Sequence, residues 1–295
     1  MKSTVSIAYN NLIDEAISSS LRLVPDLKSL FKNRHVAIKP NETWASGKDL
    51  TPCTRADTVR AVIRFVKQYG PRTITISGGA GAAETEHVFR LMGIDKVIAE
   101  EEVEYFDHNR PPFIAVELDH GPQREVMVNP RVLEYESLIS LAQHKVHNSA
   151  TVTLTMKNIA LSYPAADFYG HPREKKMHHH EVFADLQAFI AAMCSRFHID
   201  LGIIVGHPVM VGRGPIGGQT FESGLVIAGR DCVAVDSVGS RLLGFDDVEH
   251  IKYADELGLG TASSEDIEFP GLSFNKAVQI FRRKEVEAGI TTGIR

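Results

Sequence analysis

Lysines, histidines and an amide gather in one short stretch, residues 143–158, which reads QHKVHNSATVTLTMKN. Lys145 and His147 come soon after the apolar run SLISLA, and Lys157 and Asn158 follow one short apolar segment later. A charged side chain in apolar surroundings usually has a partner, because burying an unpaired charge is costly. Imidazole, with an ordinary pKa of about 6.5, suits proton transfer near neutrality. The stretch therefore predicts a site for acid–base chemistry.

A second candidate lies in IKPNETW, where Lys39 and Asn41 stand on either side of a proline that fixes the backbone. A lysine reached directly from a buried strand can bind an anion or, when desolvated, take part in proton transfer. A solvated lysine on a rigid turn is the structural alternative.

Glycines dominate a third candidate, the segment VGRGPIGG. So many glycines after a buried strand predict close approach of the backbone to a ligand, with a mobile surface loop as the alternative. The candidate ligand contacts in this loop are Gly212, Gly214, Pro215 and Gly217.

Two aspartates follow in GRDCVAVDSVGS. Asp231 is predicted to be a helix N-cap, a position that aspartate favours. Asp236 lies one turn into the same helix behind apolar residues, so it is kept as a substrate-binding candidate.

Histidine is unusually frequent, with 13 residues, and three of them are consecutive in MHHHEVF. Successive residues of a helix point about 100° apart, so His178, His179 and His180 cannot all face one site. His147 together with His179 or His180 and a further group could hold a divalent metal. A solvated helix start is the structural alternative, and His144 ranks below His147 as a site residue.

Composition excludes several classes of protein. The 295 residues carry 32 basic and 37 acidic side chains, a net charge of −5, which argues against nucleic acid or an anionic membrane as the main partner. The three cysteines lack CxxC spacing, so we expect no intrinsic iron–sulfur cluster. Few thiols and a polar N-terminus that lacks the apolar core of a signal peptide indicate a reducing cytoplasm.

Strand-like and helix-like segments alternate along much of the chain, which is typical of a mostly parallel open sheet with helices on both faces. The predicted strands are 5–9, 35–40, 73–79, 137–142, 199–210 and 224–229, and the predicted helices are 12–30, 54–69, 83–92, 151–160, 178–197, 232–243 and 247–257. Three consecutive strand-like runs between residues 103 and 129 predict an antiparallel insertion or sheet edge. Residues 1–295 suffice for a single α/β domain or for two lobes around a cleft. Ligands of such sheets bind beyond the carboxyl ends of the strands, where the candidates above are expected.

The order of these motifs resembles the domain of unknown function 362 (DUF362) family from about residue 35 to 260. The matching motifs are KPN, a T-x-x-x-T-V-R-A-V-I helix, K-x-H before V-T-L-T-M-K-N, GxGPxGG and D-x-V-A-V-D. The resemblance implies an α/β domain, a prokaryotic cytoplasmic protein and frequent pairing with ferredoxin-like modules, which here would have to be a separate partner. The positions it implies for the site are Lys39, Asn41, Lys145, His147, Lys157, Asn158, one of His178 to His180, Gly214, Pro215, Gly217 and Asp236.

The resulting hypothesis is an enzyme that acts on a small anionic substrate, a carboxylate or a phosphate ester. Lys39, Lys145 and Lys157 would bind the negative charge, and His147 would be the general base or a metal ligand. Asn41 and Asn158 would orient the substrate, and the loop 212–218 would close over it. Isomerisation by proton transfer and redox chemistry with an external iron–sulfur partner are both compatible. The alternative is a non-catalytic binder of an anionic metabolite or metal ion.

Overall fold

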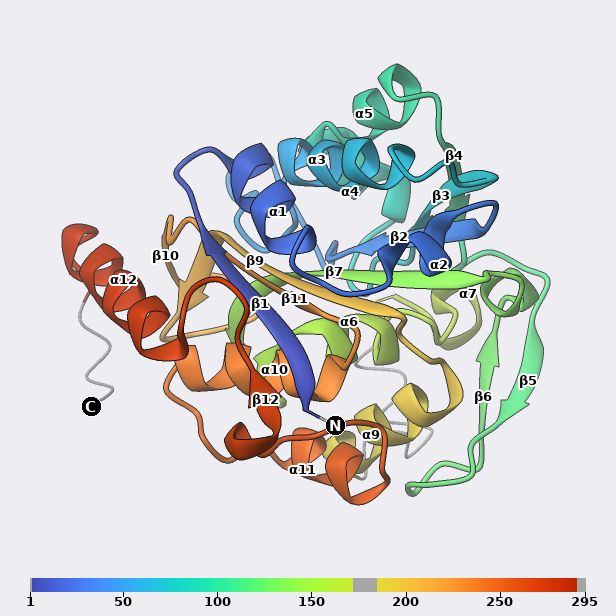
Figure 1. Ribbon diagram of the computed structural model, residues 1–295. Helices are drawn as coiled ribbons and strands as arrows, with labels where there is room; N and C mark the ends of the chain where they lie inside the picture. The colour runs from blue at the N-terminus through green and yellow to red at the C-terminus, as the bar shows by residue number, and fades with distance from the viewer. Residues whose placement is uncertain (1, 172–184, 291–295) are drawn as a thin grey trace.

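The computed structural model describes residues 2–171 and 185–290, which form a ten-stranded mixed sheet with helices on both faces (Figure 1). A separate two-stranded antiparallel sheet, β5–β6, lies at one side of the molecule. The strands are β1 (Ser3–Tyr9), β2 (His35–Pro40), β3 (Thr73–Gly78), β4 (Glu104–Asp107), β5 (Ile114–Glu117), β6 (Glu125–Val128), β7 (Ser137–His147), β8 (Thr151–Thr153), β9 (Leu201–Val211), β10 (Gln219–Phe221), β11 (Leu225–Gly229) and β12 (Ile267–Glu268).

The sheet runs in the order β12-β1-β11-β9-β7-β2-β3-β4. Strands β9, β7, β2, β3 and β4 run parallel to one another, and β11 lies antiparallel to both β9 and β1. Every residue of β2 and β7 is buried. Parallel strands covered on both faces are expected to have such continuous burial. The mostly parallel α/β fold predicted from the sequence is therefore confirmed.

The two faces of the sheet are covered by helices from different parts of the chain. Helices α1 to α5 lie on one face, whereas α6, α9, α10 and α11 lie on the other (Figure 1). Strand β2 shows why both faces are apolar, because Val36 and Ile38 pack into one core cluster and Ala37 between them packs into the other. The helices are α1 (Ile13–Leu21), α2 (Leu27–Phe31), α3 (Ala56–Lys67), α4 (Thr85–Met92), α5 (Ile94–Glu100), α6 (Thr155–Ala160), α7 (Ala166–Tyr169), α9 (Leu186–Arg196), α10 (Cys232–Leu242), α11 (Glu249–Glu256) and α12 (Phe274–Glu287).

Residues 103–129 contain both predicted alternatives, an antiparallel insertion and a sheet edge. Residues 114–128 do form an antiparallel pair, β5 with β6. The first of the three strand-like runs, however, forms β4 and extends the main sheet parallel to β3. Alternation of apolar and polar residues identifies a half-covered strand but does not specify its partner, which explains the difference.

Several element boundaries also differ from the prediction. The expected helix 12–30 is two helices, because Pro25 cannot continue the first and Asp26 has a φ of 58°. The expected helix 151–160 begins with the short strand β8, and the expected helix 178–197 is described only from Asp185 onward. The most consequential difference is β7, which was expected to end at Ala142 and instead extends to His147.

No helix in the described ranges combines the length and apolar character needed to cross a bilayer.

A charged cluster joins helix α3 to the hairpin of β9 and β10. The ring of His207 contacts Glu222 through Nδ1 at 2.5 Å and Asp57 through Nε2 at 3.1 Å, and Arg55 lies 2.8 Å from Glu222. Burial opposes the charged form of His207, but these hydrogen bonds and carboxylate charges outweigh it and raise its pKa to about 9.

This cluster is expected to make stability depend on pH. The folded pKa of His207 lies above its ordinary value of 6.5, so its contribution is complete below pH 6.5 and is lost as pH rises through about 9. After allowance for the solvent-exposed carboxylates, the loss should be about 1–2 kcal/mol. Lys145 acts with the opposite sign over part of this range, because its folded pKa is lowered to about 7. The measurement is therefore the difference in unfolding free energy between the wild type and His207→Gln in urea at several pH values. A difference that does not change with pH would contradict the assignment.

Candidate functional site

A cavity of about 310 Å³ lies beyond the carboxyl ends of β2, β3 and β7. Its walls come from the residues that follow these strands and from helix α6, which lies below them. The cavity is close to the lower end of the range of about 300–1,000 Å³ that is typical of small-molecule sites. Of the predicted site residues, the lining includes Lys39, Asn41, His147, Lys157, Asn158 and Pro215. This edge of the sheet is where ligands of open α/β sheets bind.

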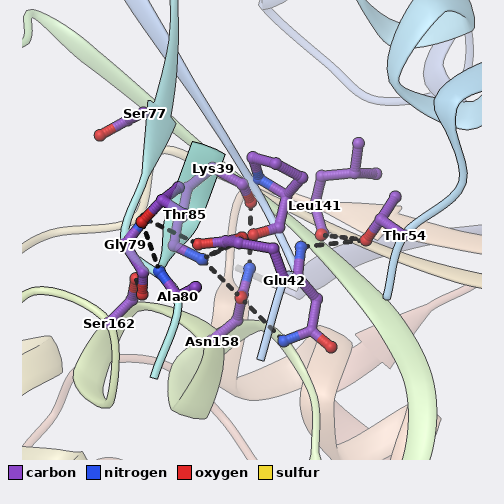
Figure 2. A network of polar contacts seen from close by, with 12 residues as sticks. Lys39, Glu42, Thr54, Ser77, Gly79, Ala80, Thr85, Leu141, Asn158 and Ser162 are labelled. Carbon is purple, nitrogen blue, oxygen red and sulfur yellow. Dashed lines mark hydrogen bonds and ion pairs between the residues drawn. The ribbon is translucent and has the colours of Figure 1, made fainter. Parts of the chain in front are cut away.

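Lys39 is the centre of a buried polar network (Figure 2). Its Nζ donates to the carbonyl oxygen of Pro40 at 2.6 Å, to Oε2 of Glu42 at 2.7 Å and to Oδ1 of Asn158 at 3.2 Å. The other carboxylate oxygen of Glu42 accepts a hydrogen bond from the backbone N–H of Gly79 at 2.8 Å. An ammonium group has three N–H donors, so the protein itself can occupy all of them. Lys39 thus holds the wall of the cavity together.

The orientations of two amides follow from this network. Oδ1 of Asn158 must face Lys39, because an ammonium group can only donate, and Nδ2 of Asn158 donates to the carbonyl oxygen of Lys39 at 3.0 Å and to Ser140 at 3.1 Å. Asn41 must then present its own Nδ2 to Oδ1 of Asn158, at 3.3 Å. This arrangement leaves Oδ1 of Asn41 as a buried acceptor without a hydrogen-bond partner among the described residues.

Helix α6 carries both Lys157 and Asn158, and Asp236 of α10 fixes its first turn. The carboxylate of Asp236 accepts hydrogen bonds from the backbone N–H and the hydroxyl of Thr155 and from the N–H of Met156, at 2.6 to 2.9 Å. Burial raises the pKa of Asp236 to about 7, although the three hydrogen bonds oppose the shift. Asp236 does not line the cavity. The predicted substrate contact is therefore a residue that positions α6.

His147 lines the cavity with a defined tautomer. Its Nδ1 accepts hydrogen bonds from the backbone N–H groups of Ser149 and Ala150, at 3.1 and 3.2 Å, so the proton of the neutral ring is on Nε2. Burial and the neighbouring charges of Lys157 and Lys145 lower the pKa of His147 to about 2. The ring is therefore a neutral hydrogen-bond donor. These contacts favour that role over the general base expected from the sequence.

Lys145 lies behind the cavity and is absent from its lining. The side chain is fully buried, and its Nζ donates to the carbonyl oxygen of Pro52 at 2.6 Å. The side-chain amide of Gln143 donates to the carbonyl oxygen of Thr51, the residue before Pro52. Burial, together with the charges of Lys157 and Lys39, lowers the pKa of Lys145 to about 7. Both residues thus attach β7 to the segment between β2 and α3, residues 41–55.

The glycine loop packs against β7 and contributes one residue to the cavity. A side chain at Gly214 would meet the carbonyl oxygen of Val146 at 1.9 Å, so this close approach requires glycine. Gly214 also exchanges hydrogen bonds with Asn148. Gly212 and Gly217 have positive φ angles and, like Gly214, do not line the cavity, whereas Pro215 does. Of these three glycines, Gly214 alone makes a close approach, to the backbone of β7.

The turn after β3 also lines the cavity, but most of its N–H groups have protein acceptors. Gly79 donates to Glu42, Ala80 donates to the hydroxyl of Thr85, and Ala82 donates to the carbonyl oxygen of Thr43. A Cβ at residue 79 would lie 1.8 Å from Nε2 of His108. These contacts indicate a tight structural turn, not a phosphate-binding loop.

Three residues near the cavity were not singled out from the sequence. Glu42 stands three positions after Lys39, but this spacing alone does not show that the two side chains are buried together. Thr153 lines the cavity, and its hydroxyl is buried without a partner among the described residues. His250 of α11 is fully buried, contacts Gln187 through Nδ1 at 2.6 Å, and has a pKa lowered to about 3 by burial and the charge of Lys157. The sequence does not identify His250, because a single histidine in an amphipathic helix does not by itself indicate a functional site.

The predicted metal site rests partly on residues outside the described ranges, since His179 and His180 fall there. Among residues 2–171 and 185–290, no three His, Cys, Asp or Glu side chains converge as metal ligands would. Nε2 of His144, the lower-ranked histidine, donates to the carbonyl oxygen of Gly239, 2.8 Å away, within the core. The three cysteines are free and buried.

Comparison with known proteins agrees with this description of the chain. Residues 36–241 match the family described as Domain of unknown function (DUF362), which is more than half of the 295 residues. The chain belongs to this family. No curated protein matches the chain in sequence.

Two solved structures have a similar fold but low sequence identity to this chain. The lactate racemase apoprotein from Thermoanaerobacterium thermosaccharolyticum superposes with a TM-score of 0.50 at 11% identity. The superposition covers 85% of the DUF362 chain described here and 56% of the racemase chain. A protein from Thermotoga maritima superposes with a TM-score of 0.45 at 14% identity, covering 78% and 58%. The chain therefore spans less than two thirds of the length of either protein, and the likeness to the racemase concerns the fold alone.

Proposed function

We propose that the cavity binds a small organic anion, a carboxylate or a phosphate ester, and that the protein is an enzyme acting on it. In this proposal Lys157 and the Nε2–H of His147 receive the anionic group. The observation that carries it is the defined tautomer of His147, a neutral donor in the same lining as the Lys157 ammonium.

The charge of the lining supports an anionic ligand. Two lysines, Lys39 and Lys157, stand against one carboxylate, Glu42, among the described lining residues. Glu42 is already engaged by Lys39 and by the N–H of Gly79. Among these described residues the lysines outnumber the carboxylates, and electrostatic attraction is stronger in a largely buried site than in water.

The buried polar network supports an active site. Keeping Lys39 and Glu42 out of water is costly, and buried ionisable groups of this kind are enriched at functional sites. One observation favours the alternative of a non-catalytic binder: the lone pair on Nδ1 of His147 is occupied by backbone N–H groups, so this ring offers no base. Catalytic turnover distinguishes the proposed enzyme from a non-catalytic binder. Conversion of a bound carboxylate or phosphate ester to a product, followed by proton NMR, is expected of the enzyme and not of the binder.

Lys157→Met tests the proposed anion contact. The single tryptophan, Trp44, lies in the segment 41–55 next to Thr43, which lines the cavity, so its fluorescence should report binding. We expect the affinity for a panel of acetate, glycolate, lactate and phosphoglycolate to fall roughly tenfold to a hundredfold, as expected for loss of a charge-assisted hydrogen bond. Lactate is included because one structural neighbour is named a lactate racemase.

The matched control is Lys48→Met, which removes the same charge from an exposed position of the segment 41–55. This variant should bind every acid as the wild type does. Equal affinities in Lys157→Met and Lys48→Met, or no binding of any acid to the wild type, would refute the proposed function.

A further inference from the structure

Part of the cavity wall is apolar and comes from helices α6 and α9. The described lining residues include Leu161 and Leu186, and also Ala82 and Pro215, and each of the four is only partly buried. The two leucines pack on one side against a hydrophobic core cluster. Apolar surface that water can reach inside a concave site is stabilised when an apolar group covers it. This part of the wall therefore offers a surface for the apolar part of a ligand.

Helix α6 places this surface beside the proposed anion contact. The N–H of Leu161 donates to the carbonyl oxygen of Lys157 at 3.1 Å, so the helical turn continues from one residue to the other. Side chains four positions apart on a helix are neighbours, with about 5–6 Å between their Cβ atoms. Both residues line the same cavity. A molecule whose anionic group binds at Lys157 therefore meets Leu161 one helical turn away.

Helix α9 contributes the second leucine and is fixed by contacts of its own. Leu186 is its first residue, and the side chain of Asp185 caps the helix by accepting from the N–H of Ala188 at 3.0 Å. The helix packs against α6, and Sγ of Cys194 donates to the carbonyl oxygen of Met156 at 3.5 Å. The apolar wall is thus held in place by the fold itself, before any ligand binds.

The polar part of the wall disfavours a ligand with many hydroxyl groups, such as a sugar phosphate. Lys39, Glu42 and Asn158 are hydrogen-bonded to one another, and the N–H groups of Gly79 and Ala82 donate to protein oxygens. Several hydroxyls in this cavity would compete for groups already engaged, or would lie unpaired against leucine, which is costly. An apolar chain meets neither difficulty.

We propose that the ligand of this cavity is an amphipathic acid, with one anionic group and an apolar chain of several carbons that contacts Leu161 and Leu186. The inference rests on the proposed function, because Lys157 and His147 would bind the anionic group of the same molecule. It adds the substrate class and makes the two leucines specificity-determining residues.

The test is a homologous series of acids, namely acetate, propionate, butanoate and pentanoate. Affinities are measured by titration calorimetry and by Trp44 fluorescence. Because each added methylene is buried against leucine, we expect the affinity to rise about twofold to fourfold per methylene. Pentan-1-ol has the chain without the charge, and ribose 5-phosphate has the charge without the apolar chain. Both should bind more weakly than pentanoate.

Leu161→Asn and Leu186→Asn should each lose most of the gain in affinity along the series, because the surface that covers the chain becomes polar. Leu161→Met should retain it, since methionine is apolar and of similar volume. The matched control is Leu133→Asn, at a leucine that is 42% exposed and does not line the cavity, and it should retain the full gain. Circular dichroism verifies the folding of each variant.

The series with the wild type decides first and needs no variant. If the four acids bind equally well, or ribose 5-phosphate binds best, the inference of an apolar chain is wrong while anion binding stands. An undiminished gain in both Leu161→Asn and Leu186→Asn, or an equal loss in Leu133→Asn, also overturns the inference. If none of these anions binds, or pentan-1-ol binds as tightly as pentanoate, the proposed function fails and the inference fails with it.

Discussion

Replacing Glu42 by glutamine is expected to lower the free energy of unfolding by about 3–5 kcal/mol, the usual cost of breaking a buried ion pair. The side chains of Lys39 and Glu42 are 2% and 1% exposed, and their charged atoms lie 2.7 Å apart. Glutamine has almost the same shape but no charge, so the variant removes the Glu42 charge that pairs with the buried Lys39 ammonium. Equilibrium unfolding in urea, followed by Trp44 fluorescence and circular dichroism, measures the change.

A double-mutant cycle distinguishes the ion pair from general damage to the core. Lys39→Met should also be destabilising, because it leaves the Glu42 carboxylate buried. The double variant Lys39→Met/Glu42→Leu removes both charges and should be less destabilised than the sum of the single variants by at least about 2 kcal/mol. Additive losses would show that the two side chains are not energetically coupled.

The second large effect is expected for Asp236→Asn, with a loss of about 2–4 kcal/mol in the free energy of unfolding. The carboxylate accepts three hydrogen bonds at the start of α6, and the amide of asparagine would direct an NH₂ group at one or more of these donors. Because α6 carries Lys157 and Asn158, affinity for organic anions should fall together with stability.

Asp231→Asn is the matched control on the same helix, α10. Asp231 caps its first turn by accepting from the N–H of Ala234 at 2.9 Å, as the sequence predicts, and its other carboxylate oxygen accepts from the hydroxyl of Ser3 and the N–H of Thr261. Asparagine is nearly as good a cap as aspartate but turns an NH₂ group toward the other two donors, so we expect a loss of about 1–3 kcal/mol. Anion binding should be unchanged, because the partners of Asp231 lie outside α6, and an equal loss of anion affinity in the two variants would contradict a specific role of Asp236 in positioning α6.

The rule for open α/β sheets explains why much of the site could be predicted from the sequence. Lys39 and Asn41 follow β2, His147 ends β7, and Lys157 and Asn158 follow soon after, so parallel strands bring them to one edge. Spacing along the chain and strand direction were sufficient for this part, because both are local properties.

The remaining roles depend on contacts that local patterns do not encode. Lys145 was expected beyond the end of a strand at Ala142, but β7 runs for 11 residues and places it inside the sheet. The role of Asp236 depends on α10 crossing the start of α6, between residues 81 positions apart. Glu42 received no role because the sequence cannot show that a lysine three positions earlier is buried beside it.

The position of β1 in the sheet has a consequence for how the chain folds during synthesis. This strand precedes the other strands of the sheet in the sequence, yet it pairs with β11 through Ile7 and Ile227 and with β12 through Ser3 and Ile267. Its hydrogen-bonding partners therefore leave the ribosome only after strands β2 to β9. Strand β1 has no partner until then, and such sequence-distant pairing is associated with slow folding and exposed strand edges. We expect chaperone contacts with the nascent chain to persist on residues 3–9 until β11 has emerged.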